Sequence, residues 1–265
     1  MGTKVCGFLF GGVLFLTIIA FIGCSTVPVT GRKQFTGLIS PSEETQLGLT
    51  SFDQLKKETR ISHDPAANSL VQKVGKRIAS VAELPNAQWE FVVFESKEAN
   101  AFCLPGGKVG IYTGILPITK DEAGLATVIG HEVSHAVARH GAERMSEAIA
   151  LQTVGQVSGA IVQEKYGVNP QTFGVAYGAV TTVGRELPHS RKQESEADHI
   201  GLVYMARAGY DPAAAVAFWQ RFSDFNKKAG GNAGPAFLRT HPVDDVRIEQ
   251  LKQWLPEAKS QYHPH

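Results

Sequence analysis

The sequence is short of cysteine and has almost no net charge, and both shortages exclude classes of protein. Three cysteines among 265 residues are too few for a disulfide framework. The 26 Lys and Arg residues nearly balance the 25 Asp and Glu residues, so the formal net charge is only +1. A chain without a basic surplus has no electrostatic footprint for nucleic acid, and we expect no nucleic-acid partner. Hydrophobic residues make up 43% of the chain, which excludes a long disordered protein.

Long apolar runs are also scarce, because only residues 5–24 form one. The absence of further runs of about 18 apolar residues excludes a membrane enzyme with several spans. Lys4 precedes the run and Cys24 ends it after a small residue, a pattern that is typical of a secretory signal and resembles the bacterial lipobox. We therefore expect residues 1–23 to be a lipoprotein signal peptide that is removed, and Cys24 to carry the lipid.

The expected location of the chain follows from this signal. Ser25 stands where an Asp usually retains such lipoproteins at the inner membrane, so we expect a lipid anchor on the periplasmic face of the bacterial outer membrane. Because about 20 apolar residues can also span a bilayer, an uncleaved inner-membrane anchor through residues 5–24 is the alternative. Both interpretations place the rest of the chain outside the cytoplasm and next to a membrane.

The remaining residues are expected to form a tether and one folded domain. Residues 24–39 are polar and rich in Thr, Gly and Pro, which predicts the tether. No shift in composition marks a second folded unit within residues 40–265. We expect an α+β fold that is mostly helical and has a small three-stranded sheet. The strands are predicted near residues 89–94, 99–104 and 108–113.

Several helix start signals divide this domain. Caps of the Ser-Pro, Asp-Pro and capping-box kinds predict helices that begin near Ser40, Asp64, Lys120, Arg191, Asp211 and His241. The helix at Lys120, with a capping box from Thr119 to Glu122, is expected to run past His140. Residues 148–184 are predicted to be helical but weakly patterned, and the last helix is expected to end before Pro256.

The motif His131-Glu132-Val133-Ser134-His135 lies in the middle of the predicted Lys120 helix. One helical turn separates His131 from His135, so both imidazoles face the same side and can reach one zinc ion. Glu132 can reach a water on that metal, whose pKa falls toward about 7, and can accept its proton. This arrangement can attack a peptide carbonyl at neutral pH. The sequence therefore predicts one zinc ion per chain and Glu132 as the general base.

A catalytic zinc ion needs a third protein ligand and an open fourth position. The segment from Arg191 to Asp198 offers carboxylates on a predicted helix. Glu194 and Asp198 are four residues apart and share one face of that helix, whereas Glu196 points elsewhere. One carboxylate could bind the metal, and the other could accept the ring N–H of a ligating histidine. Spacing alone leaves open which does which, and a solvated acidic face is the alternative.

The combination HEVSH and ESEAD resembles the zinc metallopeptidase family that contains the type 1 CAAX prenyl protease, HtpX, BepA and LoiP. Further motifs of that family follow in the same order over residues 40–255: Asn100–Gly107, Tyr112–Gly114, Leu187–Arg191 and Thr240–Pro242. The resemblance implies a zincin-type domain with His131, His135 and Glu194 as zinc ligands. It also implies Glu132 as general base and Asp198 as the partner of a ligand. Without a tetratricopeptide extension after this region, the chain is expected to be more like the periplasmic lipoprotein member LoiP than like BepA.

The resemblance further implies an endopeptidase of the bacterial envelope that cleaves unfolded or misassembled envelope proteins. The rival interpretation is a chaperone or assembly factor for outer-membrane proteins with little or no proteolysis. Glu132 favours catalysis, because a pure binding module has no need of a base next to a metal. His241 has three open roles: it could stabilise the developing oxyanion, block the metal, or cap a helix without any catalytic role.

Four other features carry weaker expectations. The strand at residues 108–113 could bind substrate as an added strand, or could be an ordinary core strand. Arg191 and Arg247 could be buried partners of carboxylates. His140 is expected only to pack or hydrogen-bond, and Cys103 is expected to be a small buried hydrophobe.

Overall fold

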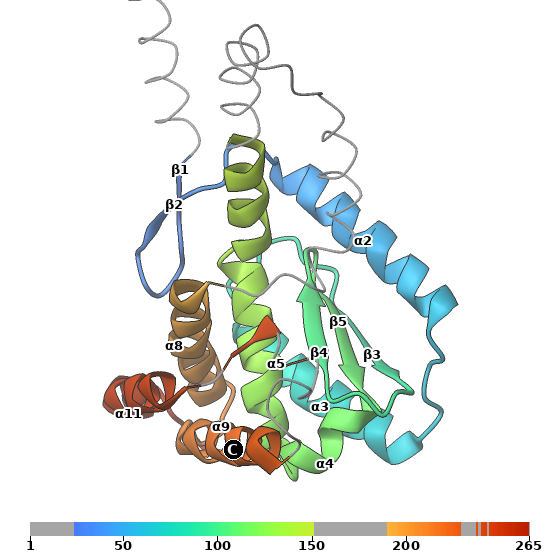
Figure 1. Cartoon of the computed structure of the whole chain (residues 1–265), viewed down its shortest axis with the longest axis vertical. Coiled ribbons are helices and arrows are strands. Elements are labelled where there is room, and N and C mark those ends of the chain that lie inside the picture. Colours follow the sequence, from blue (N-terminus) through green and yellow to red (C-terminus); the bar gives the residue numbers. More distant parts are fainter. Residues whose placement is uncertain (1–23, 151–189, 229–236, 238–239, 243, 265) are drawn as a thin grey trace, which may run out of the picture.

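The computed structural model describes residues 24–150, 190–228, 237, 240–242, 244–264 of the chain. Helix α5, Glu122–Val137, runs through the middle of the molecule (Figure 1). It packs against the sheet and α3 on one side and against α8 and α9 on the other (Figure 1). All residues of α5 from Gly124 to Val137 are buried, so this helix is the centre of the core. The predicted α+β class, mostly helical with a small sheet, is confirmed.

The three predicted strands form one sheet in the order β3-β5-β4. Its members are β3 (Glu90–Phe94), β4 (Ala101–Leu104) and β5 (Lys108–Tyr112). β5 is parallel to β3 and antiparallel to β4, so the strand at residues 108–113 is central and has no edge to offer a substrate. Of the two alternatives for this strand, the structure has the ordinary core strand, because β5 is buried along its whole length and paired on both sides. Of the described strands only β5 pairs with β4, which lies against α5.

Most predicted helix starts are confirmed by their caps. Ser40 caps α2 (Pro41–Glu58) in a capping box with Glu43, and Asp64 caps α3 (Pro65–Val81). Ser190 caps α8 (Arg191–Arg207) in a second capping box. The remaining elements are η1 (Thr113–Ile115), α4 (Leu116–Thr119), α9 (Ala213–Lys228) and α11 (Asp245–Ser260). No helix in these described parts is long and apolar enough to cross a membrane.

Both ends of α5 differ from the prediction. Lys120 has a φ of 67°, so the chain turns there, and the helix begins at Glu122 with Asp121 as its cap. The helix ends at Val137 and does not run past His140, because Arg139 takes a left-handed φ of 52°. Residues 140–150 are helical again and extend beyond the end of α5, away from α4 (Figure 1). The turn sets the direction in which His140 points.

The last helix also differs from the prediction. α11 begins at Asp245 with Asp244 as cap, so His241 precedes the helix and does not start it. Pro256 lies inside α11, which continues to Ser260. Residues 148–150 are helical, and the rest of the predicted stretch 148–184 lies outside the described residues.

The segment predicted as a tether forms an antiparallel hairpin of β1 (Cys24–Thr26) and β2 (Lys33–Phe35). Val27, Gln34 and Thr36 of this segment are buried. The Gln34 amide donates to the carbonyl oxygen of Ala138 at 2.6 Å, next to the turn after α5. The segment is therefore attached to the domain, which its polar composition did not predict. The division into signal peptide, tether and domain at residues 23 and 39 stays a prediction.

Two apolar clusters stabilise this arrangement. The larger one joins α3, α5, α8 and α9 to the sheet and contains Trp219, Tyr204 and Phe218. The smaller one fills the space between α2 and the sheet, where Phe52 and Leu55 meet Phe94, Phe102 and Tyr112. Burial of these large side chains is the main force that fixes α5 against its neighbours.

Candidate metal centre and active site

Helices α5 and α8 pack together at two glycines, and this close contact builds the site. A Cβ atom on Gly201 would lie 3.2 Å from the backbone nitrogen of His131. One on Gly130 would lie 3.3 Å from the carbonyl oxygen of Gly201. The backbones approach this closely because neither residue has a side chain. The contact brings Glu194 of α8, which is fully buried, against the histidines of α5.

Four buried side chains direct donor atoms at one centre. His131 Nε2 and His135 Nε2 lie 3.1 Å apart, and Glu194 Oε1 lies 3.3 Å from His135 Nε2. His241, from the segment before α11, places Nδ1 3.2 Å from His131 Nε2 and 2.9 Å from Glu194 Oε1. Four such atoms, one from each residue, lie within 4.8 Å of one another. This group, His131, His135, Glu194 and His241, is the metal-donor group below, and it could hold one metal ion.

The metal-donor group fits zinc. Atoms at about 2.0–2.1 Å from one tetrahedral zinc ion lie about 3.3 Å from each other, close to the separations in this group. Two imidazoles and a carboxylate match the ligands of catalytic zinc sites. The surrounding charges also favour a cation. Burial alone would lower the pKa of His131, but Asp198 and Glu194 outweigh it and raise this pKa to about 9.

Asp198 and Arg247 support the metal-donor group. Asp198 Oδ1 lies 2.9 Å from His131 Nδ1, so this ring can give its Nδ1–H to the carboxylate and direct Nε2 at the metal. Arg247 donates from Nε to Asp198 Oδ2 at 2.8 Å, and its Nη1 lies 2.8 Å from Glu194 Oε2. Burial opposes ionisation of Glu194, but His241 and Arg247 hold its pKa well below the usual range. Arg247 is therefore the buried carboxylate partner that its sequence position predicted.

Glu132 lies next to the metal-donor group without belonging to it. Its carboxylate is buried, with Oε1 3.5 Å from His241 Nε2 and in no hydrogen bond with any described residue. Burial raises the pKa of Glu132 above its ordinary value, although His241 and His131 oppose the shift. A carboxylate with a raised pKa and an uncommitted oxygen beside a metal site is suited to accept a proton from water.

Two residues that the sequence did not assign to the site contact it indirectly. His135 Nδ1 lies 2.8 Å from His140 Nδ1, and His140 Nε2 lies 3.0 Å from Glu196 Oε2. Burial lowers the pKa of His135 well below its usual range, so this ring is neutral, as a metal ligand must be. Glu196 does point away from the metal-donor group, as its spacing predicted. Helical spacing does not predict the contact of His140 with His135, because the left-handed turn at Arg139 interrupts the helix and directs His140 back toward the site.

Other predicted residues lie outside the site. The Arg191 side chain is 87% exposed and 3.4 Å from Asp244, so it is not a buried partner, contrary to expectation. Cys103 on β4 is partly buried, and burial raises the pKa of its thiol, so the thiol is protonated and unreactive. Cys24 is exposed at the start of β1.

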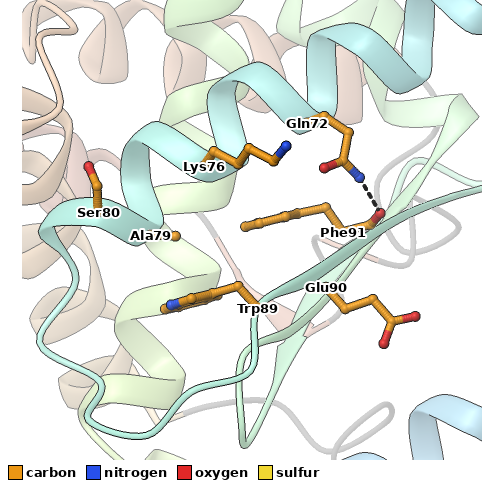
Figure 2. A pocket seen from close by; sticks show the side chains of 7 residues that line it. All are labelled: Gln72, Lys76, Ala79, Ser80, Trp89, Glu90 and Phe91. Atoms are coloured by element: carbon orange, nitrogen blue, oxygen red, sulfur yellow. Dashed lines mark hydrogen bonds between the residues drawn. The ribbon is translucent and has the colours of Figure 1, made fainter.

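A separate hollow lies between α3 and β3 (Figure 2). It measures about 460 Å³. The rings of Trp89 and Phe91 lie parallel, 6.0 Å apart between centroids, and Gln72 donates to the Phe91 carbonyl oxygen (Figure 2). Its lining includes no member of the metal-donor group.

The fold and the metal-donor group define a metallopeptidase. A family model described as peptidase family M48 matches residues 65–255. The mitochondrial metalloendopeptidase OMA1 of Schizosaccharomyces pombe is 35% identical over 254 residues, 94% of this chain and 70% of that protein. The beta-barrel assembly-enhancing protease of Yersinia pestis is 28% identical over 231 residues, 85% of this chain and 46% of that protein. The chain belongs to peptidase family M48 and is a zinc metalloendopeptidase.

Proposed function

We propose that this metalloendopeptidase is lipid-anchored in a bacterial envelope and cleaves unfolded or misassembled envelope proteins. The observation that carries its chemistry is the buried Glu132 carboxylate beside the metal-donor group. The lipobox-like sequence before the exposed Cys24 supports the anchor. The name of the Yersinia relative supports the envelope substrates, whereas the OMA1 relatives are mitochondrial. The envelope role therefore needs its own test.

In this proposal His131, His135 and Glu194 hold the zinc ion, and Asp198 orients His131. Bound there, zinc would supply Lewis acidity toward a water and the scissile carbonyl. Glu132 accepts a proton from the attacking water, whose oxygen bonds to the carbonyl carbon. The C–N bond then breaks, and Glu132 passes that proton to the departing amine.

An extended substrate would pair with the edge of β4 that no described strand occupies. β4 packs against α5, the helix that carries His131 and Glu132, and its other edge is occupied by β5. Main-chain hydrogen bonds to a strand edge do not depend on side-chain identity, which suits a protease for unfolded chains. β4 thereby takes the substrate-binding role that was one of the two alternatives for residues 108–113.

His241 acts as a block in this proposal. Its Nδ1 lies 2.9–3.2 Å from two members of the metal-donor group, where a catalytic zinc ion needs an open position. His241 must leave before a substrate carbonyl can enter. Removal of its ring should therefore increase cleavage, whereas removal of an oxyanion-stabilising ring would decrease it.

The decisive experiment compares the full-length, zinc-loaded protein in detergent with Glu132→Gln and His241→Ala, using an unfolded protein as substrate. Loss of a general base typically costs about 10²–10⁴-fold in rate, so Glu132→Gln should cut at most about 1% as fast. His241→Ala should cut faster than wild type. If zinc is bound and neither wild type nor His241→Ala cleaves the substrate, the proposed activity on unfolded proteins is wrong. That outcome would support the chaperone interpretation.

The anchor has a separate test in a bacterial host. Wild type should incorporate labelled fatty acid and fractionate with the outer membrane, and Cys24→Ala should not be labelled. Cys103→Ala is the matched control and should be labelled like wild type. Membrane retention of wild type without label would favour the uncleaved anchor through residues 5–24.

A further inference from the structure

The N-terminal hairpin reaches the metal-donor group through a chain of polar contacts. Arg32 donates from Nε to Glu196 Oε2 at 2.6 Å, and Thr30 Oγ1 donates to Glu196 Oε1 at 2.5 Å. Glu196 in turn contacts His140, which contacts His135. Glu196 and His140 are 7% and 0% exposed, so water competes little for these contacts.

When His135 directs Nε2 at a metal, one arrangement of protons gives each contact from His135 through His140 to Glu196 one donor and one acceptor. His135 then carries its proton on Nδ1 and donates it to His140 Nδ1. His140 accepts with Nδ1 and therefore donates Nε2–H to the Glu196 carboxylate. A carboxylate that holds the far side of a ligating histidine fixes its tautomer and ring orientation. In this protein a second histidine, His140, lies between the ligating His135 and the carboxylate of Glu196.

The other charges around the chain favour the same arrangement. Arg32 also binds Glu143 through both terminal nitrogens, and Gln193 donates to Glu143 Oε2 at 2.7 Å. Glu196 therefore accepts hydrogen bonds from Thr30 and Arg32 of the hairpin on one side, and its Oε2 lies 3.0 Å from His140 Nε2 on the other.

We infer that His140, Glu196 and Arg32 are positioning residues of the zinc site, and that the N-terminal hairpin is part of its support. The hairpin acts through Arg32, which holds Glu196, which orients His140 and so His135. This inference rests on the zinc site of the proposed function and is independent of the substrate. Removal of Arg32, far from the metal-donor group along the chain, should therefore weaken zinc binding.

The test measures zinc affinity of the full-length protein by competition with a chromophoric chelator. The visible spectrum of the cobalt(II)-substituted protein gives a second readout. Loss of a partner that orients a ligand typically costs about 10–100-fold in metal affinity, which is the loss expected for Glu196→Gln. Arg32→Ala should weaken zinc binding in the same direction, and both should shift the cobalt bands. Arg32→Lys keeps the positive charge but lacks the planar guanidinium with its several N–H donors, so it should recover part of the lost zinc affinity.

Lys33→Ala is the matched control. Lys33 lies next to Arg32 in the same hairpin and donates to Thr26 Oγ1, and its described contacts do not include Glu196. Its removal takes one positive charge from the hairpin and should leave zinc affinity unchanged. Wild-type affinity and cobalt spectra in Glu196→Gln and Arg32→Ala would overturn the inference, as would equal weakening by Lys33→Ala.

The conservative variants keep the test decisive. If Arg32→Ala does not fold, the near-isosteric Glu196→Gln and Arg32→Lys decide the outcome. A protein that loses zinc affinity as expected but cleaves no unfolded substrate would contradict the proposed function and support this inference.

Discussion

Among single residues, Arg247 links the two buried carboxylates of the site. It is 5% exposed, contacts the carboxylates of Glu194 and Asp198, and lies 4.5 Å above the Trp219 ring centroid. Burial would lower the pKa of this guanidinium, but Asp198 and Glu194 outweigh it and raise the pKa. The two buried carboxylates therefore depend on one permanent positive charge.

Replacement of Arg247 by Ala should destabilise the protein strongly. Breaking a buried ion pair by removing one partner costs on the order of 3–5 kcal/mol, because the other charge stays buried without compensation. Arg247→Lys should recover part of this loss, since a lysine has the charge but not the planar fork. Chemical denaturation of the zinc-free protein measures both values.

Arg191→Ala is the matched control, since Arg191 is largely exposed. Its effect on the free energy of unfolding should stay within about 0.5 kcal/mol. An equal effect of the two alanine variants would show that the buried position of Arg247 is unimportant.

The residues of the site differ in how well the sequence could predict them. His131, Glu132 and His135 follow from the spacing of one helical turn. Spacing placed Glu194 and Asp198 on one face of another helix, but only the family resemblance assigned their roles. Arg247 and His241 lie on other segments and came from a candidate pairing and from the family motif. The spacing predicted that Glu196 points away from the metal, but its contact with His140 could not be predicted, because it depends on a left-handed turn and a distant hairpin.

At the scale of elements, the glycine contact of α5 and α8 sets the distance between the two halves of the site. Gly201 faces the backbone of His131, which cannot move without moving a proposed zinc ligand. A methyl group there would lie 3.2 Å from a backbone atom, which is closer than ordinary van der Waals contact. The spacing of the helices therefore controls both packing and metal binding.

Gly201→Ala should destabilise the protein and weaken zinc binding together. Overpacking of a well-packed core typically costs about 1–3 kcal/mol, and a displacement of α8 moves Glu194 away from the histidines. Thermal unfolding and zinc competition are the two measurements.

Gly141→Ala provides the contrast, because nothing lies within 4 Å of a Cβ added at that helical position. It should stabilise the fold by about 0.5–1 kcal/mol with unchanged zinc affinity. Wild-type zinc affinity in Gly201→Ala would mean that helix spacing does not limit the site.

Element boundaries show what a sequence pattern can and cannot predict. Caps at Ser40, Asp64 and Ser190 are local hydrogen bonds, and the sequence predicted those starts. The end of α5 at Val137 depends on tertiary contacts, and the expected end past His140 was wrong. The central place of β5 also depends on tertiary contacts, and the sequence left open whether this strand was a substrate edge or a core strand. Three short apolar strands in succession do not specify which one is paired on both sides.

At the scale of the whole molecule, the N-terminal hairpin, the segment after α5 and the start of α8 are joined by one ionic cluster. Arg32 contributes the positive charge, and Glu143 and Glu196 contribute the negative charges. Arg32 and Gln193 lower the pKa of Glu143 against the effect of burial. The pKa of Glu196 falls from the ordinary 4.5 to about 2. The cluster is the largest set of charges that binds the first segment to the domain.

This cluster predicts how stability changes with acid. A carboxylate whose pKa is lowered by folding stabilises the fold above its unfolded pKa, and this contribution is lost as the pH falls toward the folded value. For Glu196 the loss extends from about pH 4.5 to about pH 2.

Arg32→Ala should therefore lower the melting temperature of the zinc-free protein at pH 7, and this difference from wild type should shrink progressively below about pH 4.5. Lys33→Ala, which removes a positive charge from the same hairpin, keeps both carboxylate contacts of Arg32, so its difference from wild type should not change over this pH range. A constant difference between wild type and Arg32→Ala from pH 7 to pH 3 would show that Arg32 holds the hairpin by packing and not by charge.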